Sequence, residues 1–195
     1  MRVIAGKYRR RTLRTLDGLA LRPTSDRLRE TLFDILGLSV QGARWLDIYA
    51  GSGAIGIEAL SRGAVEVVFI ESNRSAINVI RQNLKALNIS TKASVMAADA
   101  SVGLQQLATR EFIADSIFLD PPYNLADEYQ ATLECLNDFA ILGAGGVIIA
   151  EHARRNPLPE RFSRLVRVRV VEQGDAALSF YRRAGGLQSH DAREQ

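Results

Sequence analysis

Apolar residues along this chain follow two patterns that alternate over most of its length. Short continuous apolar runs, which are typical of buried strands in a parallel sheet, occupy residues 44–49, 65–70, 93–97, 116–119 and 147–151. Apolar residues spaced three and four positions apart, which indicate helices, lie at about 26–36, 54–61, 73–87, 101–108 and 127–139. Strand and helix therefore alternate, and this predicts an α/β fold in which helices cover both faces of a mostly parallel sheet.

The two ends of the chain depart from this alternation. Residues 165–173 alternate valine with arginine and precede a Gly-Asp turn and a second apolar run at 177–181, which predicts an antiparallel hairpin. Residues 143–146 are rich in glycine and predict a turn. The expected organisation is a basic N-terminal arm or hairpin at 1–25, one domain at 26–184 and a polar tail at 185–195.

One predicted strand ends in an unusual sequence, Asp120-Pro121-Pro122-Tyr123. Each proline lacks an N–H group and disfavours helix in the residue before it, so the main chain here is stiff and extended. Its carbonyl groups are then free acceptors at the carboxyl edge of the sheet, where open α/β folds bind ligands. One carboxylate and one aromatic face beside them suit a flat ring that carries an amino group, although four such residues also occur in ordinary surface turns.

A second motif, Gly51-Ser52-Gly53-Ala54-Ile55-Gly56, follows a predicted strand and opens a predicted helix. Its glycines allow the main chain to approach a ligand, and Glu71, twenty residues after Gly51, can hold a ribose diol. This arrangement fits a nicotinamide- or flavin-dependent enzyme, and it also fits a tight turn without a ligand.

Two carboxylates favour S-adenosylmethionine over a dinucleotide. Asp47 lies four residues before Gly51, where it would repel a pyrophosphate but attract a cationic amino-acid group or sulfonium. Asp99 follows the third predicted strand, where it can accept a hydrogen bond from an adenine amino group. Either residue could instead cap a helix or a turn.

Charge is unevenly distributed along the chain. The net charge is +7 over residues 1–29, −8 over 30–153 and +4 over 154–195. Basic ends fit a polyanionic partner, and Arg9, Arg10 and Arg11 beside Tyr8 resemble a phosphate-contacting patch with one stacking ring. A solvated basic surface would have the same composition, so charge alone does not decide the function.

The remaining composition excludes several classes of protein. Apolar residues make up 47% and charged residues 24%, which is typical of a soluble globular protein. A single cysteine, Cys135, excludes an internal disulfide, and the spacing of His152 and His190 does not predict a metal site. There is no apolar run of membrane-spanning length and no signal sequence, so we expect a cytoplasmic protein.

The motifs together resemble a known family. The sequences at 47–53 and 120–123 are similar to two motifs of the class I S-adenosylmethionine-dependent methyltransferases. The block Arg22-Pro23-Thr24-Ser25-Asp26-Arg27, the basic arm and the sequence at 50–64 resemble the bacterial 16S ribosomal RNA guanine-N(2) methyltransferases. The resemblance extends from Arg2 to about Tyr181, and it implies a Rossmann-like class I methyltransferase fold with a seven-stranded, mostly parallel sheet.

The resemblance also implies an activity and its residues. The chain would transfer a methyl group from S-adenosylmethionine to the exocyclic 2-amino group of a guanine in 16S rRNA, as a monomer and without a metal. The implied catalytic residues are Asp120, Pro121, Pro122 and Tyr123. The implied cofactor-binding residues are Asp47, Ala50, Gly51, Ser52, Gly53, Glu71, Ser72, Asp99 and Ala100. The implied RNA contacts are Lys7, Arg9, Arg10, Arg11, Arg22, Thr24 and Arg27.

Three alternatives remain open from the sequence. An adenine in DNA or RNA carries an amino group that would satisfy the same acceptors. A nicotinamide-dependent oxidoreductase fits the glycine motif, but Asp47 and the absence of an evident second domain for a substrate disfavour it. A non-catalytic RNA-binding or assembly protein would need only the basic ends.

Overall fold

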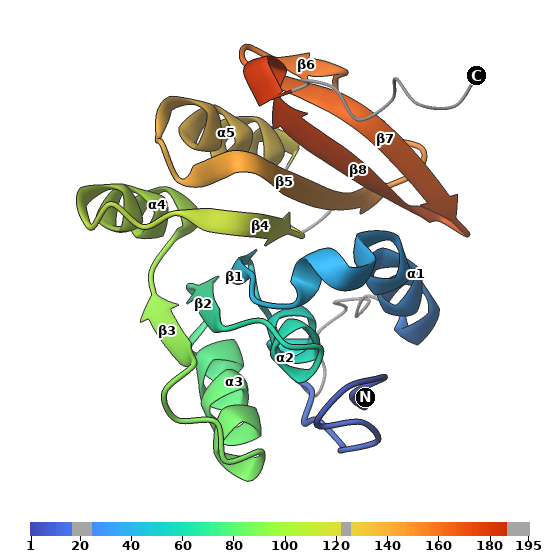
Figure 1. Ribbon diagram of the computed structural model, residues 1–195, viewed down its shortest axis with the longest axis vertical. Helices are drawn as coiled ribbons and strands as arrows, with labels where there is room; N and C mark the ends of the chain where they lie inside the picture. The colour runs from blue at the N-terminus through green and yellow to red at the C-terminus, as the bar shows by residue number, and fades with distance from the viewer. Residues whose placement is uncertain (17–24, 122–125, 187–195) are drawn as a thin grey trace.

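The computed structural model describes residues 1–16, 25–121 and 126–186. In this part of the chain one eight-stranded sheet forms, in the order β3-β2-β1-β4-β5-β8-β7-β6 (Figure 1). The strands are β1 Arg44–Ile48, β2 Glu66–Glu71, β3 Ala93–Ala97, β4 Ala114–Leu119, β5 Leu142–Ala153, β6 Arg161–Phe162, β7 Leu165–Gln173 and β8 Ala176–Arg183. Strands β1 to β5 are parallel, and the C-terminal strands are antiparallel.

This architecture confirms the predicted α/β fold with its antiparallel C-terminal hairpin, but the predicted number of strands was wrong. The sheet has eight strands because the two-residue β6 pairs with the start of β7, through Arg161 with Val166 and Phe162 with Leu165. A pair of two residues is too short to produce the period-two pattern from which strands are predicted.

Helices cover both faces of the sheet (Figure 1). They are α1 Asp26–Leu36, α2 Ala54–Ser61, α3 Arg74–Ala86, α4 Ala100–Thr109 and α5 Ala126–Asp138, with short 3₁₀ helices η1 at Gly37–Val40 and η2 at Ala184–Gly186. Helices α1, α2 and α3 share one hydrophobic core with one face of the sheet. Helices α4 and α5 share a second core with the other face. None of the described helices is long and apolar enough to cross a membrane.

Local sequence explains where two of these helices begin. The Ser25 hydroxyl accepts a hydrogen bond from the Leu28 N–H at 3.1 Å, which caps α1. The Asn73 carboxamide oxygen accepts hydrogen bonds from the N–H groups of Ser75 and Ala76, which caps α3. Both predicted helix starts are therefore confirmed.

The glycine-rich segment at 143–146 is not a turn between elements, as the sequence predicted, but part of β5. On β4, Ala114 pairs with Leu142 and Ser116 pairs with Val147, so β5 accommodates extra residues in a bulge. A Cβ atom on Gly146 would lie 2.7 Å from the Leu142 side chain, and Gly145 has a φ of +76°. The bulge therefore needs glycine. Because turns are also rich in glycine, the sequence alone suggested a turn here.

The N-terminal segment, residues 1–16, packs closely against α2 and α3. The buried Glu58 carboxylate accepts hydrogen bonds from the N–H groups of Ile4 and Ala5, at 2.8 and 2.9 Å. Val3 and Leu13 are buried in the core shared by α1, α2 and α3. A Cβ atom on Gly6 would lie 1.9 Å from the Ser61 carbonyl oxygen, so only glycine permits this approach. This part of the predicted arm is therefore a fixed element of the fold, whereas residues 17–24 lie outside the described residues.

Candidate functional site

Three strands end side by side at one edge of the sheet. Ile48, the last residue of β1, pairs with Ile70 on β2 and with Leu119 on β4. The next residues along these strands, Glu71 and Asp120, therefore lie on either side of the main chain that leads from β1 into α2. The topology brings the glycine motif, Glu71 and Asp120 together, as the parallel-sheet prediction requires.

The connection from β1 to α2 is the predicted glycine-rich turn. Gly51 and Gly53 have positive φ values of 54° and 76°, and the Gly53 N–H donates to the Ala50 carbonyl oxygen at 2.7 Å. A Cβ atom on Gly56 would lie 2.4 Å from the Phe69 ring, so this glycine allows α2 to pack closely on β2. Each glycine of the motif therefore serves either the turn or the packing beneath it.

Glu71 ties the glycine turn to the start of α3. One carboxylate oxygen accepts the Gly51 N–H at 2.8 Å, and the other accepts the Asn73 N–H at 2.8 Å. The side chain is half-buried, and Ser72 beside it is exposed. Because each carboxylate oxygen has a second lone pair, Glu71 can still accept from the two hydroxyl groups of a ribose.

Asp47 lies beneath the turn rather than at its surface. The side chain is buried, and its Oδ2 atom accepts the Gly56 N–H at 2.9 Å. Burial raises the pKa of Asp47 to about 8, the negative charge of Glu71 adds to the rise, and the Gly56 hydrogen bond opposes it. In a dinucleotide-binding protein, N–H groups at the start of this helix would help to bind the pyrophosphate. Here the Gly56 N–H is already bound to the Asp47 carboxyl group, and this disfavours a dinucleotide.

Asp120 is half-buried directly after β4. Burial raises the pKa of Asp120 well above its usual range, and the nearby charges of Glu151 and Asp47 raise it further. Glu151 is buried on β5, where the preceding residue, Ala150, pairs with Leu119. The sequence predicted Glu151 as the end of a buried strand but did not predict it as a further carboxyl group of this site.

A tyrosine that the sequence indicated only as part of a helix face supports the chain after Asp120. The buried Tyr129 hydroxyl donates to the Glu151 carbonyl oxygen at 2.7 Å and lies 3.4 Å from the Pro121 carbonyl oxygen. The stronger bond is to Glu151, because 3.4 Å is long for an O–H donor. The predicted residues Pro122 and Tyr123 lie outside the described residues.

The predicted adenine contacts lie one strand further along the same edge. Asp99 is exposed at the start of α4, and Ala100 beside it is buried. Ala97 on β3 pairs with Glu71 on β2, so Asp99 follows two residues beyond that pair. The structure therefore places Asp99 on the far side of Glu71 from Asp120.

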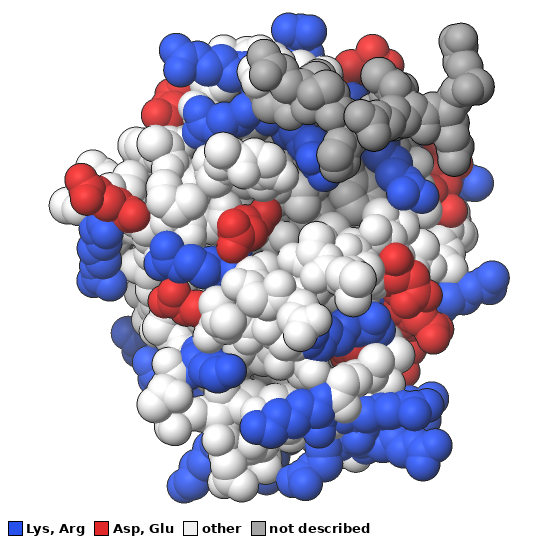
Figure 2. All heavy atoms as spheres, in the orientation of Figure 1, with Lys and Arg blue, Asp and Glu red and all other residues white. Residues whose placement is uncertain are grey.

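The predicted RNA contacts fall into two groups. Lys7, Arg9, Arg10 and Arg11 are exposed on the N-terminal segment, where Figure 2 shows a dense group of basic side chains at the lower right. The Lys7 main-chain N–H donates to the carbonyl oxygen of Ser61, the last residue of α2. Because α2 has eight residues, this end of the helix lies about 12 Å from the glycine turn at its start. Arg27 is exposed on the first turn of α1, and Arg22 and Thr24 lie outside the described residues.

The basic residue that the structure ties to the glycine turn is one that the sequence did not single out, Arg14. The Asn83 carboxamide on α3 accepts the Arg14 N–H at 2.8 Å and donates to the Arg14 carbonyl oxygen at 3.1 Å. The same amide nitrogen donates to the Ser52 carbonyl oxygen at 3.0 Å. Asn83 thereby joins the N-terminal segment to the turn, a contact between residues too far apart in the sequence to be predicted from it.

Comparisons with known proteins agree with this geometry. The family described as conserved hypothetical protein 95 matches residues 1–182. The Bacillus subtilis protein YlbH, provisionally named an rRNA methyltransferase, is 38% identical over 95% of this chain and 100% of its own length. Ribosomal RNA small subunit methyltransferase D of Escherichia coli K12 is 38% identical over 82% of this chain and 78% of its own.

A solved structure from Escherichia coli, provisionally named methyltransferase yhhF, is 36% identical and superposes with a TM-score of 0.80. The alignment covers 94% of this chain and 97% of that chain. Sequence and fold therefore agree with these methyltransferase relatives over most of the chain, and the chain belongs to the conserved hypothetical protein 95 family.

Proposed function

We propose that this protein transfers a methyl group from S-adenosylmethionine to the exocyclic 2-amino group of a guanine in 16S rRNA. The observation that carries the proposal is the position of Asp120, which lies across β1 from Glu71 with the glycine turn between them. A base held at Asp120 and a nucleoside held at Glu71 would meet above this turn. The names of the relatives, rRNA and small subunit methyltransferases, support the same reaction and substrate.

The carboxyl groups at this edge fit S-adenosylmethionine. Glu71 would hold the ribose hydroxyls, and Asp99 with Ala100 the adenine, while main-chain groups of Ala50–Gly53 and Ser72 complete the site. Asp47 is buried beneath the turn, so it would act on the cationic methionine end by fixing the turn through its bond to the Gly56 N–H. The cofactor supplies an activated methyl group on a positively charged sulfur. A set of carboxylates suits this cation and its hydroxyl and amino groups, and it does not suit the phosphates of a dinucleotide.

Asp120 and Pro121 would hold the amino group that receives the methyl group. The Asp120 carboxylate and the Pro121 carbonyl accept its two N–H bonds, which turns the nitrogen lone pair toward the methyl carbon. As the C–N bond forms, the bond between sulfur and the methyl carbon would break and leave a neutral thioether. Both acceptors stabilise the positive charge on nitrogen, and the raised pKa makes Asp120 a suitable acceptor for the departing proton. The adjacent cationic cofactor favours the ionised form of Asp120 that this role needs. Pro122 would keep the chain extended, and Tyr123 would stack on the base.

Contacts outside the active site, made by charged residues, would also bind the RNA substrate. RNA phosphates would be contacted, without reading of the sequence, by the basic residues Lys7, Arg9, Arg10, Arg11, Arg22 and Arg27 and by the Thr24 hydroxyl. The proposed site needs no residue from a second chain, so a monomer would suffice, and sedimentation in the presence and absence of RNA would test this. The protein would meet a ribosomal RNA substrate in the cytoplasm, and assays with both protein-free 16S rRNA and small-subunit particles would identify the preferred form.

Asp120→Ala tests the assigned chemistry. We expect methyl transfer to be lost and cofactor affinity to stay within a few-fold, because Asp120 contacts the base and not the cofactor. The readout is mass analysis of nucleosides from rRNA treated with labelled cofactor, with N2-methylguanosine as the expected product. Unchanged turnover in the variant, or a methylated adenosine as the product of the wild-type protein, would refute the proposal.

A further inference from the structure

A cavity of about 350 Å³ lies at the edge of the sheet opposite to Asp120. Its floor is the bulge at the start of β5, and its walls come from the end of β8 and the residue before β7. Along β4, five residue steps separate Ala114, which pairs with Leu142 beside the bulge, from Leu119 beside Asp120, so the cavity lies about 17 Å from the candidate active site. The cavity is therefore distinct from the site described above.

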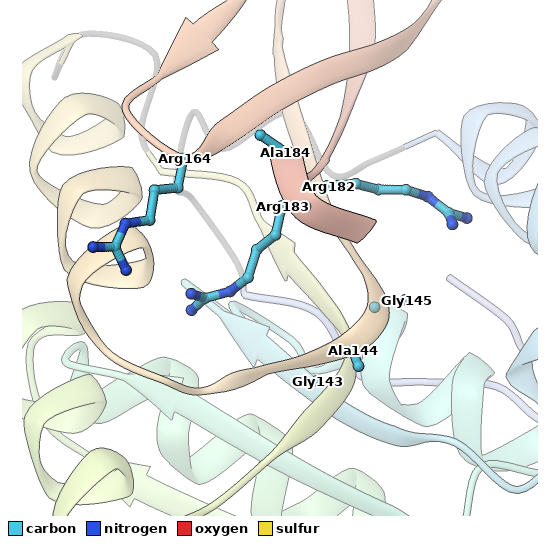
Figure 3. Close-up of a pocket in the computed structure, with 9 residues that line it drawn as sticks. Gly143, Ala144, Gly145, Arg164, Arg182, Arg183 and Ala184 are labelled. Atoms are coloured by element: carbon cyan, nitrogen blue, oxygen red, sulfur yellow. The ribbon is translucent and has the colours of Figure 1, made fainter. Parts of the chain in front are cut away.

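Three arginines and a floor of small residues line this cavity. Arg164, Arg182 and Arg183 line it together with the segment from Gly143 to Gly146. In Figure 3 the side chains of Arg164 and Arg183 extend in the same direction, and Arg182 extends to the other side of the β8 end. Because the floor residues have no side chain beyond Cβ, an anion between the arginines can reach the main chain.

The charges of these arginines are not neutralised within the described part of the chain. None of the described residues that line the cavity is acidic, and none of the three arginines forms an ion pair there. Arg183 donates one N–H to the Phe139 carbonyl oxygen at 2.9 Å, while its buried Nε has no hydrogen-bond partner among the described residues. A buried N–H without a partner is costly, and an anion in the cavity could accept from it.

The basic surface continues around the edge of the sheet. A second cavity of about 410 Å³ shares Ala144, Gly145, Gly146 and Arg182 with the first and adds Arg169. Its described lining includes one acidic residue, Asp115, and one oxygen of that carboxylate already accepts the Arg44 N–H at 2.8 Å. Arginines therefore line both sides of the glycine bulge, which is the arrangement expected for an extended polyanion and not for a single small anion.

We propose that this surface, formed by Arg164, Arg169, Arg182, Arg183 and the bulge at 143–146, binds the phosphate backbone of RNA. The inference rests on the proposed function, because it gives the rRNA substrate a second attachment at the edge opposite to the reaction. The contacts are with phosphates and sequence-independent, so this surface contributes affinity and orientation while the other edge selects the base.

The double variant Arg164→Gln/Arg182→Gln tests this surface. Both side chains are exposed, and Arg183 is left unchanged because of its bond to Phe139. We expect the affinity for 16S rRNA to fall about tenfold or more. The slope of log K against log salt should become shallower by about 1.4–1.8, at about 0.7–0.9 per lost phosphate contact. A dinucleotide is too short to reach from one edge of the sheet to the other, so its binding at the active site should be unchanged.

The control is Arg81→Gln/Arg110→Gln, which removes the same charge from other exposed positions and should leave the salt slope unchanged. The proposal would be overturned if the Arg164→Gln/Arg182→Gln variant bound long RNA with the affinity and salt slope of the wild type. It would also be overturned if the variant lost affinity only for small-subunit particles, because that result would indicate a protein partner. Binding of inorganic phosphate with unchanged RNA affinity would also overturn it. RNA binding is measured without methyl transfer, so a failure of the proposed reaction would be seen separately in the nucleoside analysis.

Discussion

Asn83→Ala is the substitution that tests most directly how the N-terminal segment and the glycine turn are held together. The side chain is 2% exposed and makes three hydrogen bonds, two to the main chain of Arg14 and one to the Ser52 carbonyl oxygen. Alanine leaves three main-chain groups without these partners. At about 1 kcal/mol for each hydrogen bond, the free energy of unfolding should fall by about 2–4 kcal/mol.

The substitution should also weaken cofactor binding, because Ser52 lies in the turn that is proposed to bind the cofactor. We expect S-adenosylmethionine to bind several-fold more weakly, since the free turn must be ordered on binding. Urea denaturation measures the stability, and isothermal titration of the folded variant with S-adenosylmethionine measures the affinity.

Gln82→Ala is the matched control for Asn83→Ala. Gln82 is the neighbouring residue on α3, is exposed, and accepts a hydrogen bond from the Arg14 guanidinium at 2.8 Å. Loss of this surface contact should change stability by less than about 0.5 kcal/mol and leave cofactor affinity intact. If Asn83→Ala behaves like Gln82→Ala in both measurements, the reasoning about Asn83 is wrong.

Two further predictions concern the same edge of the sheet. The folded-state pKa of Asp47, about 8, is above its ordinary value of 3.8, so the folded protein binds the extra proton and its stability should fall as pH rises from about 4 to 8. Asp47→Asn should flatten that part of the profile in urea denaturation measured at each pH, and a profile identical to the wild type would contradict the assignment. Gly56→Ala places a Cβ atom 2.4 Å from the Phe69 ring and should cost about 1–3 kcal/mol of stability by the same assay, whereas Gly37→Ala, which meets no atom within 4 Å, tests the strain of a positive φ alone.

Many of the elements that form the fold could be predicted from local sequence. Ser25 and Asn73 cap their helices with their own side chains, and the apolar runs before Asp47 and Asp120 form strands because both of their faces are buried. Where local sequence supports two structures, as in the glycine-rich segment at 143–146, the prediction was wrong. There the pairing of β5 with β4 decides between a turn and a bulge.

The sequence by itself determined the order of strands and helices, the glycine turn and the carboxylates at the strand ends, because each depends on neighbouring residues and on the periodicity of one element. Only the tertiary structure decided which distant groups meet. Glu151 joins Asp120 through the pairing of β4 with β5, and Asn83 joins Arg14 to Ser52 across three segments. Arg164 and Arg183 lie on either side of the β7–β8 pairing and line one cavity with the β5 bulge. Such contacts depend on strand register and helix packing, which are set by the whole core and leave no local pattern in the chain.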